Sequence, residues 1–125
     1  MSDAEARVRD FLATMERRDL VGAKAFLAPG FTMTFPGNRK FTQLEELVAF
    51  GASRYRSVGK KYDRFDNVTD GDTTIVYCYG TLFGEWLDGR AFEGIRFIDR
   101  FTVREGLFVD QLVWNDLGEV ALSSD

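Results

Sequence analysis

The stretch GIRFIDRFTVREGLFVDQLVWND, residues 94–116, decides the fold that we predict for this chain. Apolar residues recur at every second position on both sides of Arg104-Glu105-Gly106, as in two β-strands joined by a tight turn. Asp99 shares its predicted face with the apolar residues Ile95, Phe97, Phe101 and Val103. An unpaired charge is costly there. Asp99 is therefore either satisfied by a neighbour (the Tyr55 hydroxyl, the Gln111 amide or a buried water) or held for function.

Outward from this stretch, the chain divides into helices followed by strands. Capping-box patterns at Ser2 and Thr42 predict the starts of a first and a third helix, and Asp19 caps a short second helix through Leu27, ended by Pro29-Gly30. Further strands are predicted over 31–35, 62–68, 73–86, 90–103 and 107–115, with turns at 36–38, 69–72 and 88–89 and a break at 59–61. Helices followed by long strands predict an α+β fold, with the helices on one face of an antiparallel sheet.

The long strands carry apolar residues on both faces. Opposite Asp99, the last two strands present Ile98, Leu112 and Trp114, and Arg96 and Arg100 lie on the same side. Helices can cover only one face, and a wide exposed apolar surface usually marks an interface. We therefore expect a homodimer formed through the outer face of the sheet.

Composition limits the possible functions. The chain has 125 residues, the size of a single domain over 1–125, and a net charge of −4 that argues against nucleic-acid and membrane binding. The chain has no histidine, which excludes histidine-based catalysis and the common histidine-ligated metal sites. Cys78 is the only cysteine and we interpret it as a small buried apolar residue. We expect no cofactor and no metal, and a cytoplasmic location.

A cluster of basic residues lies near the predicted break and comprises Arg54, Arg56, Lys60, Lys61 and Arg64. We interpret it as a solvated helix end and loop, and a site for an anionic partner is the alternative.

Four stretches together resemble the nuclear-transport-factor-2-like (NTF2-like) superfamily, and within it the SnoaL-like polyketide cyclase and ketosteroid isomerase group. They are VRDFLATMERRDLVGAKAFLAPGFTMTF (8–35), TQLEELVAF (42–50), DGDTTIVYCYGTLFGEWLDGRAFEG (70–94) and IRFIDRFTVREGLFVDQLVWND (95–116). The resemblance implies a cone, in which three N-terminal helices pack on a strongly bent antiparallel sheet. It also implies a pocket for an apolar small molecule at the open end of the cone.

The resemblance also implies roles for single residues. Asp99 matches an aspartic acid that ketosteroid isomerases keep protonated, so that it donates a hydrogen bond to an enolate oxygen. Phe11 and Phe35 stand where that group has its second donor and its general base, and Val113 stands where SnoaL-type cyclases have an aspartate. Cys78 and Gly80 stand where the limonene epoxide hydrolases have an Arg-x-Asp pair. If the alignment slips by one residue, Asp110 or Asp116 becomes the candidate acid or base.

The implied pocket is apolar and aromatic, and Asp99 is its hydrogen-bonding anchor. Its predicted lining comprises Phe11, Met15, Phe31 or Met33, Phe35, Val48, Tyr55, Val76, Cys78, Phe97, Phe101, Gln111 and Val113. Because no acid–base pair is identifiable, we expect a protein that binds a small hydrophobic molecule, without catalysis or with an unidentified activity. The alternatives are a cofactor-independent isomerase or cyclase acting on a polyketide-like or steroid-like carbonyl compound, and a dimerising scaffold module. Whether the chain is an enzyme stays open at this stage.

Overall fold

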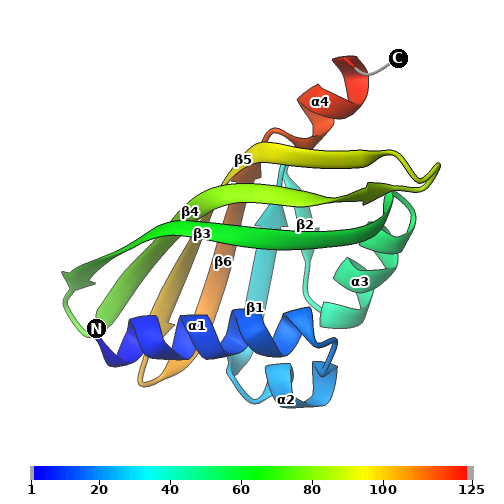
Figure 1. Cartoon of the computed structure of the whole chain (residues 1–125). Coiled ribbons are helices and arrows are strands. Elements are labelled where there is room, and N and C mark those ends of the chain that lie inside the picture. Colours follow the sequence, from blue (N-terminus) through cyan, green and yellow to red (C-terminus); the bar gives the residue numbers. More distant parts are fainter. Residues whose placement is uncertain (1, 124–125) are drawn as a thin grey trace.

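A curved sheet with helices against its concave side makes up the fold in the computed structural model, which describes residues 2–123 (Figure 1). The helices are α1 (Asp3–Glu16), α2 (Leu20–Lys24), α3 (Leu44–Ala52) and α4 (Leu117–Ser123). The strands are β1 (Leu27–Phe35), β2 (Arg39–Phe41), β3 (Tyr55–Asp70), β4 (Thr73–Trp86), β5 (Ala91–Arg104) and β6 (Leu107–Asn115). This is the α+β architecture that the sequence predicts, with the short strand β2 and, after the last strand, the helix α4 added.

The strands of the described chain follow the order β2-β1-β6-β5-β4-β3. Strands β3 to β6 form an antiparallel meander, as predicted. In contrast, β1 pairs with β6 in parallel, so the prediction of a wholly antiparallel sheet is corrected at that edge. A parallel pair needs a long connection, and here the connection is the entire stretch from β2 to β5.

Several boundaries differ from the sequence prediction, and β1 starts at Leu27 instead of residue 31. The second helix ends at Lys24 instead of Leu27, and Pro29-Gly30 lies inside β1 at a register shift. The third helix starts one residue late, with Gln43 as its N-cap and Glu46 completing the capping box. Strand β3 continues through residues 59–61, where the sequence predicts a break. Pairing with β4 along almost its whole length supplies hydrogen bonds that outweigh the weak strand propensity of this polar, glycine-containing segment.

The opening stretch folds as β5, a tight turn and β6. Glu105 and Gly106 both have positive φ angles, 52° and 76°, which places both turn residues in the left-handed region favoured in two-residue hairpins. Along β5 the burial alternates as predicted: Phe97, Asp99 and Phe101 are buried, whereas Ile98 is exposed. Local periodicity thus fixes which face of β5 turns toward the helices.

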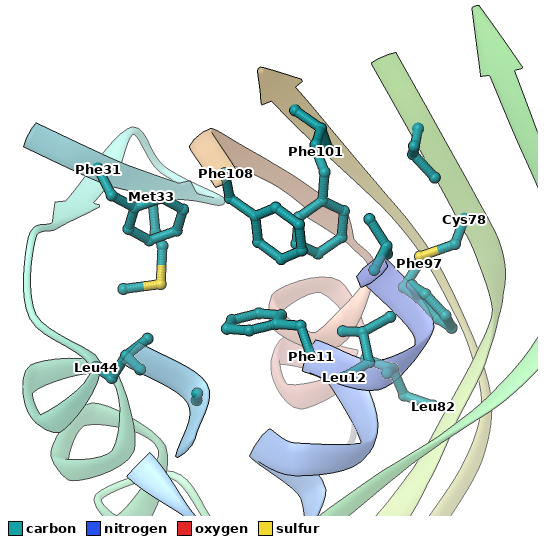
Figure 2. Close-up of a cluster of buried hydrophobic side chains, with 14 of the residues drawn as sticks. Phe11, Leu12, Phe31, Met33, Leu44, Cys78, Leu82, Phe97, Phe101 and Phe108 are labelled. Atoms are coloured by element: carbon teal, nitrogen blue, oxygen red, sulfur yellow. The ribbon is translucent and has the colours of Figure 1, made fainter. Parts of the chain in front are cut away.

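The core lies between α1 and the concave face of the sheet (Figure 2). Figure 2 shows Phe11 pointing from α1 toward Phe101 and Phe108, and their ring centroids lie 5.9 Å and 5.1 Å from that of Phe11. Both contacts are edge-to-face, a favourable geometry for aromatic pairs. The aromatic content of the sequence is therefore used largely for packing at the narrow end of the cone.

The convex face of the sheet is only partly covered within residues 2–123. Ile98 and Trp114 are 43 % and 51 % exposed, and Phe83 is 39 % exposed. Ile98 and Trp114 are on the face that the sequence assigns to the outside. Their exposure agrees with the proposed interface, but the structure contains one chain and so leaves the homodimer as a prediction.

Candidate functional site

A cavity of about 270 Å³ opens between α1, α3 and the inner face of β3. Helix α1 contributes Phe11, Leu12 and Met15, and α3 contributes Leu47, Val48, Gly51 and Ala52. Strand β3 supplies residues 55–60 and Tyr62, and Phe35 and Gln111 complete the wall from β1 and β6. The lining is mainly apolar, with a few polar groups that converge on it, which is the usual make-up of a small-molecule site.

The structure brings some of the predicted lining residues together and places others in the core. Phe11, Met15, Phe35, Tyr55 and Gln111 line the cavity, as does Val48. The remaining predicted residues lie outside its wall and are at most 7 % exposed; they are Phe31, Met33, Val76, Cys78, Phe97, Phe101 and Val113. The difference arises because α1 covers part of the sheet, as in the contact of Phe11 with Phe101, and the open space lies beside β3 and α3.

Tyr55 packs in the cavity directly against Gly51 of α3. A Cβ atom on Gly51 of α3 would lie 3.0 Å from the Tyr55 hydroxyl oxygen and 3.3 Å from two ring carbons. Glycine at this position therefore lets the Tyr55 ring pack directly on the helix, which accounts for a residue that otherwise weakens a helix interior. Burial raises the pKa of Tyr55, so its phenol stays neutral and serves as a hydrogen-bonding group.

Asp99 lies at the centre of β5 with 0 % exposure, between Cys78 of β4 and Val113 of β6. Its Oδ2 accepts a hydrogen bond of 2.5 Å from the Lys60 ammonium. Its Oδ1 is buried and has no hydrogen-bond partner among residues 2–123. The sequence offered Tyr55, Gln111 or a water as the partner of Asp99. The structure instead supplies a cation that the sequence analysis assigned to a solvated loop.

Lys60 is a candidate site residue that the sequence analysis named only within the basic cluster, where a site for an anionic partner was the alternative to a solvated loop. It lies on β3 and its side chain is 27 % exposed. Together with Val58 and Tyr62, at alternate positions of the same strand, it lines the cavity. The predicted strand 62–68 stops short of Lys60. In a strand that continues through residues 59–61, side chains alternate between the two faces, and Lys60 shares the inner face with Val58 and Tyr62. Lys61, the next residue, is exposed and packs its ammonium over the ring of Phe83 at 5.6 Å.

The ionisation states of this region follow from burial and from the ion pair. Burial by itself lowers the pKa of Lys60, but the adjacent Asp99 carboxylate outweighs burial and holds that pKa above its usual value. Burial also raises the pKa of Tyr62 and of Cys78, each to about 12. Lys60 is therefore an ammonium at neutral pH, and Cys78 is a protonated thiol, which is a poor nucleophile.

The fallback acids of the sequence analysis lie away from the cavity wall. Asp116 accepts a hydrogen bond of 2.6 Å from Arg96, and Asp110 pairs in register with Thr102. The register also pairs Asp99 with Val113. Among the described residues, Glu16 is the carboxylate that lines the cavity.

Residues 2–123 contain no group of three or more His, Cys, Asp or Glu side chains arranged to hold a metal ion. In the same residues, every helix is too short or too polar to cross a bilayer.

Comparisons with known proteins place this geometry in a wider group. A family model described as a SnoaL-like domain matches residues 8–111. An NTF2-like protein of unknown function from Burkholderia pseudomallei is 23 % identical, with a TM-score of 0.77 over 98 % of this chain and 97 % of its own. TerC, co-crystallised with polyporic acid, is 18 % identical, with a TM-score of 0.78 over 98 % of this chain and 97 % of its own.

A more distant structure carries a functional name. A protein from Jannaschia named as a SnoaL-like polyketide cyclase is 19 % identical, with a TM-score of 0.56 over 78 % of this chain and 72 % of its own. At these identities the solved structures establish the fold alone. A comparison with curated proteins finds no match.

Proposed function

The chain belongs to the SnoaL-like domain family, and on that premise we propose that it binds a small, largely apolar molecule in the cavity between α1, α3 and β3. The observation that carries the proposal is the cavity itself, in which Phe11, Met15 and Phe35 form an apolar wall around the polar groups of Lys60 and Gln111. Such a wall provides affinity through burial of apolar surface, and a few polar groups provide orientation.

The size of the cavity and the fold of its relatives support this proposal. Ligand pockets occupy roughly 300–1,000 Å³, and about 270 Å³ is close to the lower end of that range. A compound of a few fused or linked rings is therefore the largest that we expect without opening of the wall. TerC, which shares the fold, was co-crystallised with the small molecule polyporic acid.

A ligand screen with a cavity-filling variant tests the proposal. We expect thermal-shift or native-mass screening against ketones, sterols and aromatic polyketides to find compounds that stabilise the protein. Met15→Trp would fill the cavity from α1 and should abolish their binding, whereas Trp114→Phe on the convex face should leave it unchanged. Equal binding by the Met15 variant would place the ligand elsewhere and refute the proposed site.

A second candidate function is favoured by the Lys60–Asp99 pair. Lys60 lines the cavity and contacts a second titratable group, the buried Asp99, and proton-transfer catalysis requires positioned titratable groups of this kind. In this alternative, a cofactor-independent isomerase or cyclase acts on a polyketide-like or steroid-like carbonyl compound. Lys60 polarises the carbonyl oxygen, and Glu16 or a bound water removes the proton.

Exchange of carbon-bound hydrogen separates catalysis from binding. A ligand ketone incubated in deuterated water should lose its α-proton signal in NMR spectra if the cavity catalyses enolisation. Lys60→Met should stop this exchange, and the exposed neighbour Lys61→Met should retain it. Binding without any exchange above the buffer rate leaves the chain as a binding protein.

The third alternative is a dimerising scaffold, in which the convex face pairs with that of a second copy. Exposed Phe83, Ile98 and Trp114 supply the apolar surface for it. Dimerisation is compatible with a ligand-binding cavity, because the cavity opens on the other side of the sheet, between β3 and the helices. We therefore propose both, a ligand site inside the cone and a self-interface outside it.

A further inference from the structure

We propose that the molecule bound in the cavity carries an acidic oxygen (a carboxylate, phenolate or enolate) and that Lys60 is the residue that selects it. This inference rests on the proposed binding function and narrows it to a class of ligand. It starts from the polar part of a mainly apolar cavity wall, where Lys60 is held in an ion pair with the buried Asp99.

The Lys60 ammonium has N–H donors that Asp99 does not use. An ammonium carries three N–H donors, and Asp99 Oδ2 accepts one of them at 2.5 Å. Among residues 2–123 the structure gives the Lys60 ammonium no other hydrogen bond, and Nζ also lies over the face of Phe97, 5.0 Å from the ring centroid. The remaining donors belong to a residue that lines the cavity, so a ligand oxygen can accept from them.

Asp99 holds that ammonium in place. The carboxylate is fully buried on the central part of β5, and the lysine reaches it from β3 across the intervening strand β4. Lys60 pairs in register with Leu82 of β4 whereas Asp99 pairs with Cys78, so the contact runs diagonally over β4. A positioned donor costs little ordering entropy when a ligand binds, unlike a lysine that is free in solvent.

The charges around the cavity favour an anion. Arg18 and Arg56 line it together with Lys60, and Glu16 is the carboxylate that lines it among the described residues. Cations therefore outnumber carboxylates even when Asp99 is counted, although the whole chain has a net charge of −4. A cleft with one sign of charge and apolar walls concentrates ligands of the opposite sign.

The test compares matched pairs of ligands that differ in charge. Naphthoate with naphthamide, and benzoate with benzamide, are titrated into the full-length protein by calorimetry at neutral pH. A charge-assisted hydrogen bond is expected to favour each acid by about tenfold or more over its amide. Lys60→Met should remove this preference, and Lys61→Met, which changes the same charge on an exposed side chain, should retain it.

The outcomes separate this inference from the proposed function. If acid and amide bind the wild type equally, the cavity binds apolar rings but Lys60 does not select an anion, and only this inference fails. If the Lys60 variant keeps the preference, the anion is received elsewhere and the inference is overturned. If no ring compound binds at millimolar concentration, the proposed function fails as well. Because Lys60→Met leaves Asp99 unpaired, the double variant Lys60→Met/Asp99→Asn provides a neutral, matched background for the same titrations.

Discussion

Breaking the Lys60–Asp99 pair should destabilise the protein in a way that depends on which partner is removed. In Lys60→Met, the carboxylate of Asp99 stays buried at 0 % exposure with neither oxygen paired within the described chain. Removing one partner of a fully buried pair costs about 3–5 kcal/mol. The Lys60 side chain is 27 % exposed, and the resulting access to water reduces the expected loss to about 2–3 kcal/mol.

The reciprocal change is expected to cost less. Asp99→Asn keeps the shape and an acceptor oxygen for Lys60, whose partly exposed ammonium can also reach water. We expect a loss of about 1–2 kcal/mol, the usual value of a hydrogen bond to a charged group. The double variant Lys60→Met/Asp99→Asn buries no unpaired charge and should lie within about 1 kcal/mol of the wild type.

Urea unfolding of the four proteins at neutral pH and a fixed protein concentration measures these differences directly. The coupling energy from the double-mutant cycle gives the interaction between the two side chains. Lys61→Met serves as the matched control and should change stability by less than about 0.5 kcal/mol, since Lys61 is exposed. A Lys60→Met variant as stable as this control, or single-variant losses that simply add, would refute the buried ion pair as a stabilising unit.

Four further predictions come from other parts of the structure. Gly80→Ala should destabilise β4 by about 2–4 kcal/mol in the same unfolding assay, because its Cβ would lie 2.0 Å from the backbone oxygen of Lys61. Gly118→Ala in α4 meets nothing within 4 Å and should instead stabilise by about 0.5–1 kcal/mol. The pKa of folded Tyr62 is raised from 10.0 to about 12, so its share of stability is present below pH 10 and lost as pH rises toward 12. Tyr62→Phe should accordingly flatten the loss of stability over that window; an unchanged slope would contradict the raised pKa. Sedimentation at micromolar concentration should show a wild-type dimer and a Trp114→Lys monomer, and a monomeric wild type would rule out the proposed interface.

Much of the fold was predictable because it depends on local rules. Alternation along β5 assigned Asp99 to the buried face and Ile98 to the exposed face, and the structure confirms both. The Ser2 hydroxyl caps α1 by accepting from the Glu5 amide, as its capping-box pattern predicted. Each of these signals involves residues a few positions apart, so the sequence carries it directly.

The candidate site was less predictable because its residues come from separate helices and strands, which the folded sheet brings together. Six residues of the lining predicted from the sequence do line the cavity: Phe11, Met15, Phe35, Val48, Tyr55 and Gln111. Other apolar residues of the predicted lining, such as Phe101, pack against α1 in the core instead. Sequence periodicity identifies a buried face, but it does not say which part of that face a helix covers.

By itself, the sequence determined the class of fold, the faces of the long strands and the burial of Asp99. Only the tertiary structure decided what Asp99 is paired with. Lys60 lies 39 positions away in the sequence and reaches Asp99 through the register of three neighbouring strands. Register is a property of the assembled sheet, and a single residue of slip moves a side chain to the opposite face. That is why a lysine assigned to a solvated loop became the polar group of an apolar cavity.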